Sequence, residues 1–228
     1  NGFLNILWAA KKHKIKRVVY AASSSTYGDS KELPKTEENI GKPLSPYAVT
    51  KYVNELYAGV FSNLYGLELI GLRYFNVFGR KQDPDGAYAA AIPKFIKALI
   101  NHKSPIIHGD GMQSRDFTYI NNVIQANELA ATTKNTQALN QVYNIACGQQ
   151  STIKDLVDKL KVLLCVFDPE IKNISLKFGP ERIGDVKHSL ASIEKAKALL
   201  NFRPTHSVEK GLHDAIKWYW NYFYDNKI

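Results

Sequence analysis

A tyrosine and a lysine one helical turn apart are the residues of this sequence best suited to acid–base chemistry. Tyr47 and Lys51 lie in the stretch SPYAVTK, at positions i and i+4 of an expected helix, so their side chains share one face. A free phenol titrates at about pH 10 and is a poor base at neutrality, but a nearby cation favours the phenolate. The pair is therefore a candidate proton-transfer group, although the same spacing is common on ordinary helix surfaces.

Three serines upstream of this pair provide a second element of chemistry. In YAASSSTYGD, an apolar run typical of a buried strand ends directly in Ser23, Ser24 and Ser25. Ligands of open parallel α/β sheets bind at the carboxyl ends of the strands. We therefore expect a serine here to hydrogen-bond a substrate hydroxyl and to orient proton transfer to Tyr47. A simple turn would use the same residue types.

The elements that must position these groups alternate between helix and strand. Apolar spacing predicts a helix over residues 3–13, an almost wholly apolar strand over 16–23, a long helix from Pro46 to the stop at Gly66, and a second apolar strand over 67–79. Ser45 is the expected N-cap of the long helix. This order predicts an α/β fold with an open parallel sheet.

The pattern changes after Gly79. We expect the following elements in turn: a loop and helix over 83–103, two short strands around a Gly-rich turn over 105–120, a helix over 122–133, a strand over 141–146, a helix over 153–164 opened by a Thr152–Asp155 capping box, and a final helix over 208–223 whose Trp218 and Trp220 pack in the core. A soft domain boundary is expected near residue 80.

Composition narrows the class of protein. The 228 residues are 45% hydrophobic and 22% charged, as in globular domains, with no apolar run long enough to span a membrane and no secretory signal at the start. Cys147 and Cys165 show neither a disulfide framework nor metal-ligand spacing, so we expect them to be buried in a reducing cytoplasm. The net charge of +9 suits a polyanionic small molecule better than nucleic acid, because the lysines are scattered rather than gathered in one aromatic patch.

Several motifs together resemble the extended short-chain dehydrogenase/reductase family: the serine run, SPYAVTK, LRYFNVFG, GDGMQSRDFTYI, VYNIA and GDVKHSL. The resemblance implies a Rossmann-like doubly wound sheet, with residues 1–80 as the remainder of an NAD-binding domain. Residues 81–228 would form mainly a smaller nucleotide-sugar lobe, with about 115–147 returning to the first domain. Within the family, the chain is most similar to bacterial UDP-N-acetylglucosamine 4-epimerases of polysaccharide biosynthesis.

The resemblance also implies roles for individual residues. Ser23, Tyr47 and Lys51 would be catalytic, with Tyr47 as the base at the sugar 4-hydroxyl. The cofactor NAD would be contacted by Tyr47, Lys51, Tyr74 and Val77. The UDP-sugar would be contacted by Ser24, Ser25, Asn76, Ala90, Arg115, Arg182, Asp185 and Ser189. Guanidinium groups suit a pyrophosphate, and a small residue at 189 leaves room for an N-acetyl group, although Ser189 would also serve as a helix N-cap.

The type of reaction follows from carboxylates that are absent. Dehydratases of this fold carry an Asp-Glu pair where this chain has Ser24 and Ser25, and decarboxylating relatives carry a glutamate there. Epimerisation through a 4-keto sugar is therefore favoured, by a protein that the resemblance implies is a homodimer. A related oxidoreductase or dehydratase, a non-catalytic nucleotide-sugar-binding protein and, more distantly, a nucleic-acid-binding module remain alternatives. The sequence leaves the preferred sugar open among UDP-GlcNAc, its uronic acid and UDP-Glc.

The glycine-rich turn that cradles a dinucleotide pyrophosphate is not found in this sequence. The chain also begins at Asn1, in what the pattern indicates is the middle of a helix. We therefore expect it to be the carboxyl-terminal two thirds of a longer enzyme. Taken alone, this piece is expected to bind NAD weakly or not at all and to be inactive.

Overall fold

The chain divides into two compact units, each built from three separate stretches of sequence. The computed structural model describes residues 1–85, 90–181 and 187–225. Unit 1 comprises residues 1–75, 121–148 and 190–205, and unit 2 comprises residues 76–120, 149–189 and 206–228. The first division thus falls between Phe75 and Asn76, a few residues before the expected boundary. The assignment of cofactor and sugar-nucleotide roles to two domains stays a prediction.

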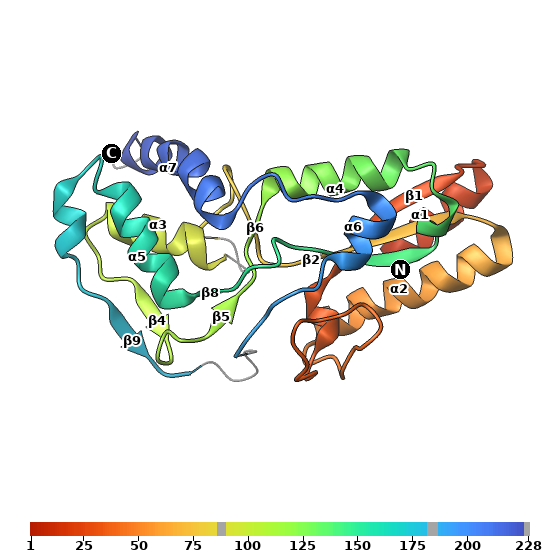
Figure 1. Cartoon of the computed structure of the whole chain (residues 1–228), viewed down its shortest axis with the longest axis horizontal. Helices are drawn as coiled ribbons and strands as arrows, with labels where there is room; N and C mark the ends of the chain where they lie inside the picture. The colour runs from red at the N-terminus through yellow and green to blue at the C-terminus, as the bar shows by residue number, and fades with distance from the viewer. Residues whose placement is uncertain (86–89, 182–186, 226–228) are drawn as a thin grey trace. The chain divides into compact units, whose positions relative to one another are not determined.

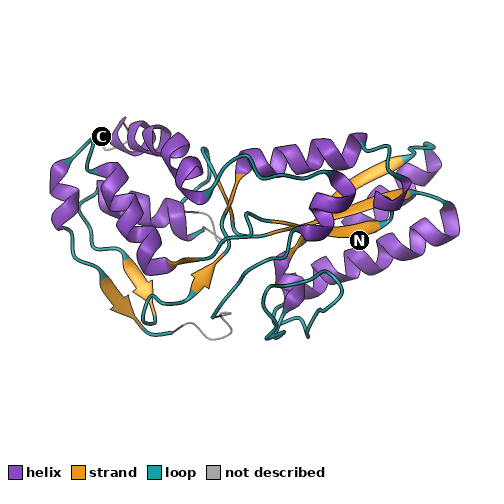
Figure 2. Cartoon of the chain, viewed as in Figure 1, coloured by secondary structure: helices purple, strands orange, loops and turns teal. Residues whose placement is uncertain are grey.

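Unit 1 is an α/β structure built on a three-stranded parallel sheet with the strand order β1-β2-β7. Its elements are α1 (Gly2–Lys12), β1 (Arg17–Ser23), the 3-10 turn η1 (Ser24–Tyr27), α2 (Pro46–Tyr65), β2 (Glu68–Tyr74), α4 (Ile120–Thr132), η2 (Thr136–Ala138), β7 (Gln141–Ile145) and α6 (Glu194–Leu200). Figures 1 and 2 draw α2 and α4 on opposite sides of this sheet. The predicted α/β class and parallel sheet are confirmed.

The register of the sheet places the site residues in one row. Ser23, the last residue of β1, pairs with Tyr74, the last residue of β2, and Tyr74 pairs with Ile145 of β7. The carboxyl ends of all three strands therefore meet at one edge. This is the edge at which open parallel sheets bind ligands.

Helix α2 begins and ends as its sequence predicts. The Ser45 Oγ accepts a hydrogen bond from the backbone N–H of Ala48 at 3.1 Å, and Pro46 occupies the first helical position. Gly66 ends the helix with a φ of +67°, in the left-handed region that glycine adopts without strain, and its N–H donates to the Ser62 carbonyl. These caps fix the residues at which α2 begins and ends, and so place Tyr47 in its first turn.

Apolar packing holds α2 against the sheet. Leu7 of α1, Phe61 of α2 and Leu69 of β2 are buried in one cluster, and α2 contacts both β1 and β2. Burying each such side chain contributes roughly 1.5–3 kcal/mol. The face of α2 that is turned toward the strands is thereby set.

Unit 2 combines a helical cluster with short paired strands. Its elements are β3 (Val77–Phe78), α3 (Ala91–Ile100), β4 (Ile106–His108), β5 (Ser114–Arg115), β6 (Thr118–Tyr119), β8 (Ser151–Thr152), α5 (Ile153–Leu164), η3 (Pro169–Asn173), β9 (Lys177–Gly179) and α7 (Val208–Asp225). Helices α3, α5 and α7 pack on one another around a large apolar core. The Thr152 Oγ1 accepts from the Asp155 N–H at 3.0 Å, which confirms the expected cap of α5.

The region 105–120 differs from its sequence prediction. It forms three short strands rather than two, and none of them pairs with another: β4 pairs with β9, β5 with β8 and β6 with β3. The reason lies in the Gly-rich turn. The N–H of Gly109 donates to the Gly179 carbonyl at 2.9 Å, so the turn extends the β4–β9 pairing and does not close a hairpin.

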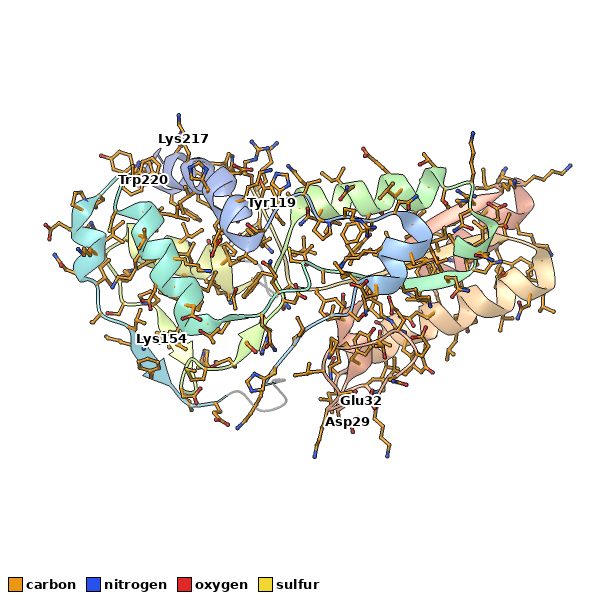
Figure 3. All side chains as sticks on the ribbon, in the orientation of Figure 1. Asp29, Glu32, Tyr119, Lys154, Lys217 and Trp220 are labelled. Atoms are coloured by element: carbon orange, nitrogen blue, oxygen red, sulfur yellow. The ribbon has the colours of Figure 1, made fainter. Side chains whose placement is uncertain are left out.

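Helix α7 packs closely on the rest of unit 2 through a glycine. A Cβ on Gly211 would lie 2.7 Å from the Cβ of Tyr119, too close for any other residue without a shift. Tyr119 is labelled beside the start of α7 in Figure 3. Trp218 and Trp220 are partly buried against the apolar core, as expected.

Both cysteines are half-buried, so the expectation that they are fully buried is wrong. Cys147 accepts a weak hydrogen bond from the Asn122 side chain at 3.6 Å, which holds its sulfur at a polar edge of the sheet. In the part of the chain that the structure describes, no group of three or more histidine, cysteine or acidic residues could hold a metal ion. None of the described helices is long and apolar enough to span a bilayer.

Candidate active site

Ser23 ends β1 with its hydroxyl group held by its neighbours. The Ser23 Oγ accepts hydrogen bonds from the backbone N–H of Ser25 at 3.2 Å and from the Ser25 hydroxyl at 2.9 Å. A serine hydroxyl carries one hydrogen of its own in addition to its two acceptor sites. Because both bonds are accepted, the Ser23 hydrogen remains to be donated to a substrate oxygen. Ser24 is half-buried beside it.

Tyr47 and Lys51 lie together on the first two turns of α2. The Lys51 Nζ is 5.7 Å from the centre of the Tyr47 ring, and it donates to the Ala21 carbonyl of β1 at 2.9 Å. The Tyr47 side chain is 51% exposed, and its hydroxyl makes no hydrogen bond to any described residue. The structure therefore brings the lysine to the strand that carries Ser23 and leaves the phenol open to a ligand.

These two residues fit one end of a nicotinamide cofactor. An ammonium group has three hydrogens to donate, of which Lys51 uses one for Ala21. The remaining donors and the Tyr47 hydroxyl are suited to the neighbouring hydroxyl groups of a ribose. Tyr74, also expected near the cofactor, is anchored by exchange of hydrogen bonds with the Asn127 side chain at 3.0 and 3.1 Å, and burial raises the pKa of Tyr74.

A buried ion pair lies behind these groups. Glu55 of α2 accepts two hydrogen bonds from Arg73 of β2, at 3.0 Å to Nε and 2.7 Å to Nη2. Burial, the largest single influence, acts to lower the pKa of Arg73, but the hydrogen bonds to Glu55 and the charges of Glu55 and Tyr27 together outweigh it and raise that pKa. The Arg73 guanidinium lies 4.9 Å from the centre of the Tyr27 ring, and burial raises the pKa of Tyr27 to about 12.

A second buried carboxylate holds the loop that follows η1. The Glu37 side chain accepts from the Asn144 backbone N–H at 2.8 Å, and the Asn144 amide donates to the Lys35 carbonyl at 2.9 Å. Burial raises the pKa of Glu37, although the hydrogen bond from Asn144 acts in the opposite direction. In Figure 3 Asp29 and Glu32 mark the exposed tip of the same loop. The loop is thus fastened to β7 at its base.

Unit 2 contains a cavity of about 530 Å³. Its walls include the expected substrate residues Asn76, Ala90 and Arg115 and the expected cofactor residue Val77. Asn76 has a φ of +35°, and its side-chain amide donates to the Asp116 carbonyl at 2.9 Å. One amide hydrogen of Asn76 remains for a ligand.

The cavity has both basic and apolar residues in its wall. Lys94, Lys103, His108 and Arg115 line it, and none of its described wall residues is an Asp or Glu. The Arg115 Nη1 donates to the Ser114 and Lys187 carbonyls, which orients the guanidinium. The apolar wall comprises Phe78, Ile92, Phe95, Pro105, Ile106, Phe117 and Ile153. Such a cavity suits a ligand with a flat ring and an anionic group.

The remaining sequence predictions have mixed outcomes. Arg182 and Asp185 lie outside the described residues. Ser189 is half-buried, and its backbone N–H donates to the Ser114 carbonyl at 3.0 Å, beside the strand of Arg115. The alternative role of Ser189 as a helix cap is wrong, because α6 begins only at Glu194, with Ile193 at its N-cap position.

The sequence pattern missed functional candidates in both units. In unit 2 it missed Lys94, Lys103 and His108, because scattered cations give no periodic signal. In unit 1 it missed Glu55 and Arg73, for which two signals existed. Glu55 follows Lys51 at the same four-residue spacing, and Arg73 is a charge inside an apolar strand, where burial requires a partner.

Comparisons with known proteins give a family match and several similar proteins. Residues 1–146 match the NAD dependent epimerase/dehydratase family. A putative UDP-glucose 4-epimerase of Methanocaldococcus jannaschii is 35% identical over 95% of this chain and 67% of its own length. The solved UDP-N-acetylglucosamine 4-epimerase of Methanobrevibacter ruminantium M1, in complex with UDP-N-acetylmuramic acid, is 40% identical with a TM-score of 0.86 over 95% of this chain and 67% of its own.

A third similar protein was solved with a cofactor. The UDP-glucuronic acid 4-epimerase of Bacillus cereus, in complex with NAD, is 31% identical with a TM-score of 0.83, over 97% of this chain and 67% of its own. The chain thus spans about two thirds of the length of these proteins.

The pKa of Glu37 leads to a prediction about stability and pH. Because folding raises this pKa, the charged carboxylate weakens the fold, by an amount that is zero below the ordinary glutamate pKa and complete above the raised one. We expect Glu37→Gln to gain thermal stability relative to the parent as pH rises from about 4 to about 8. Thermal unfolding followed by circular dichroism across that range measures the difference.

The neighbouring Glu38 supplies the control. Burial acts to raise the pKa of Glu38, but Lys195, at 3.1 Å, outweighs it and lowers that pKa. Glu38→Gln should therefore lose a little thermal stability relative to the parent as pH rises. Parallel trends for the two variants would contradict the assignment.

Proposed function

Because the chain belongs to the NAD-dependent epimerase/dehydratase family, we propose that the whole protein inverts carbon 4 of a UDP-hexose, with UDP-GlcNAc and UDP-GalNAc as the interconverted pair. We place this reaction in the cytoplasm, which the two free cysteines favour, and in the supply of surface-polysaccharide precursors. The observation that carries the proposal is the arrangement of Ser23, Tyr47 and Lys51 at the carboxyl end of β1.

Each of these three side chains has one task. The Tyr47 oxygen takes the proton from the sugar 4-hydroxyl, with the Lys51 ammonium group beside the phenol ring. Ser23 donates its remaining hydrogen to the same sugar oxygen and orients it. NAD, when bound, would supply reversible hydride transfer at carbon 4. Once the 4-keto sugar has rotated to present its other face, Tyr47 returns the proton to the oxygen on carbon 4. Carbon 4 then has the opposite configuration, and no external reductant is consumed.

The cavity of unit 2 is proposed to hold the UDP part of the substrate. Its basic residues match the charge of a diphosphate, and its apolar wall matches the flat face of a uracil ring. Ser189 and Ala90 are small, which supports an N-acetylated sugar. The related proteins that act on UDP-glucuronic acid make the uronic acid the second substrate to assay.

We also propose that two copies of the chain associate through α2. Its exposed apolar residues recur at spacings of four and three: Val49, Val53, Leu56, Val60 and Leu64. Such a stripe is the seam by which two helices pack on each other, and a two-fold axis brings the same stripe from a second copy. Trp8 and Ile6 of α1 add exposed apolar surface on the neighbouring helix.

Loss of the Tyr47 hydroxyl should abolish turnover. In the full-length protein, Tyr47→Phe is expected to lower the rate of UDP-GalNAc formation from UDP-GlcNAc by about 10²–10⁴-fold, the usual contribution of an acid–base group. The anomeric proton signals of the two sugars in the NMR spectrum measure this rate. Tyr57→Phe, an exposed tyrosine of the same helix, is the matched control and should retain activity. A parent protein inactive on UDP-GlcNAc but active on UDP-glucuronic acid would contradict the N-acetylhexosamine assignment.

Removal of a cavity lysine should weaken UDP binding. Lys94 and Lys97 both lie on α3, but Lys94 lines the cavity whereas Lys97 donates to Asp85 at 2.7 Å. Lys94→Gln is expected to raise the Kd for UDP about fivefold, corresponding to about 1 kcal/mol for an exposed charge. Lys97→Gln should leave the Kd unchanged in the same calorimetric titration. Equal effects of the two variants would place UDP elsewhere.

A charge in the stripe of α2 should separate the two copies. Val53→Glu with Val60→Glu is expected to halve the mass measured by sedimentation equilibrium, because both side chains would be buried uncompensated. Val162→Glu, on the exposed face of α5, is the control and should leave the mass unchanged. A monomeric parent protein would refute this interface.

A further inference from the structure

The face of α2 that carries Tyr47 and Lys51 continues to a third charged residue. Glu55 follows Lys51 by four positions, as Lys51 follows Tyr47, so the three side chains lie along one side of the helix. The side chain of Glu55 is 6% exposed, and that of its partner Arg73 is 4% exposed. A carboxyl group and a guanidinium group are therefore enclosed one helical turn beyond Lys51.

This enclosure is unusual among the ion pairs of the described residues. Every other pair has at least one side chain more than 10% exposed, including Arg17–Glu68 at the opposite ends of the same two strands, at 18% and 14%. Burying an ion pair sacrifices hydration, and apolar side chains of similar volume are often at least as stabilising. Stability alone therefore does not explain why charges occupy these two positions.

The position of Arg73 in the sheet suggests the explanation. Arg73 pairs in register with Ala22, one row before the row of Ser23 and Tyr74. Its Nη1 donates to the Glu37 carbonyl at 2.9 Å, and its guanidinium faces the Tyr27 ring of η1. The Thr26 hydroxyl of η1 lies 3.4 Å from the Glu55 Oε1. One ion pair thus joins α2, β2, η1 and the following loop, the elements that surround Ser23.

We propose that Glu55 and Arg73 are positioning residues that set the rotation of α2 about its own axis and so aim Tyr47 and Lys51 at Ser23. This proposal rests on the proposed function. Apolar packing alone tolerates small rotations of a helix, whereas a two-pronged bond between a carboxylate and a guanidinium has one geometry. Because a helix is stiff over two turns, a rotation at Glu55 is carried to Tyr47, about 12 Å away along the axis.

The first test separates turnover from substrate binding. In the full-length protein, Glu55→Gln should lower kcat by about 10- to 100-fold, as expected for a displacement of about 1 Å at the reacting atoms, with KM nearly unchanged. Glu68→Gln breaks an ion pair of the same strands at their other ends and is the matched control. It should lower the melting temperature and leave kcat unchanged. Equal losses of kcat in the two variants would overturn the proposal.

The second test removes the charges without leaving one unpaired. Glu55→Leu combined with Arg73→Met fills the same space with apolar side chains, so the melting temperature should return to or above that of Glu55→Gln. If the pair sets the rotation of α2, kcat stays low in this stable double variant. Recovery of kcat together with the melting temperature would show that the pair merely stabilises the fold.

A third readout does not depend on turnover and keeps failure of this inference apart from failure of the proposed function. With 3-fluorotyrosine incorporated, the ¹⁹F signal of Tyr47 is assigned by its loss in Tyr47→Phe. Glu55→Gln should shift this signal, because the ring changes its place relative to Lys51 and β1, while Glu68→Gln should leave it in place. An unmoved signal in Glu55→Gln would overturn the inference even for a protein active on another substrate.

Discussion

The parallel pairing of β1 with β2 is the constraint on which the candidate active site depends. This pairing places Ser23 opposite Tyr74, and the capped helix α2 crosses back over the two strands with Lys51 bonded to the Ala21 carbonyl. A shift of one residue in the register would turn Ser23 to the other face of the sheet. The hydrogen bond from Lys51 would then reach a different residue of β1. The pairing of the strands, more than any single contact, therefore decides which hydroxyl group lies at the carboxyl end of β1.

The surroundings of this site combine two kinds of force with different precision. Apolar side chains such as Leu7, Phe61 and Leu69 supply most of the free energy that holds α2 to the sheet, and they do so without a preferred direction. Directional groups then select one arrangement. The Glu55–Arg73 pair and the bonds of Asn144 to Glu37 and Lys35 belong to this second kind. Polar and charged groups that are shielded from water interact more strongly than exposed ones. Once paired, they therefore fix the relative positions of the elements that carry them.

The sequence predicted what depends on local pattern and missed what depends on distant contacts. The caps of α2 at Ser45 and Gly66, the apolar strands and the Tyr47–Lys51 face follow from periodicity and from the chemistry of a few residue types. That β4, β5 and β6 do not pair with one another was not predictable, because their partners β9, β8 and β3 lie elsewhere in the chain. The same holds for the wall of the cavity, where Lys94, Lys103 and His108 become neighbours only in the folded unit. The half-burial of the cysteines likewise depends on packing that an apolar sequence context does not reveal.

The alternation of the two units along the chain also bears on how such proteins diversify. Each unit is made of three stretches, so the polypeptide passes between the units at five points, after residues 75, 120, 148, 189 and 205. No single contiguous piece of the gene encodes either unit. A single crossover within residues 76–205 would therefore divide both units at once. A crossover between β2 and β7 would also separate two strands that pair with each other. New ligand preferences in this architecture are accessible chiefly through point substitutions in the walls of existing cavities, because exchange of a whole unit would require several matched crossovers in one event.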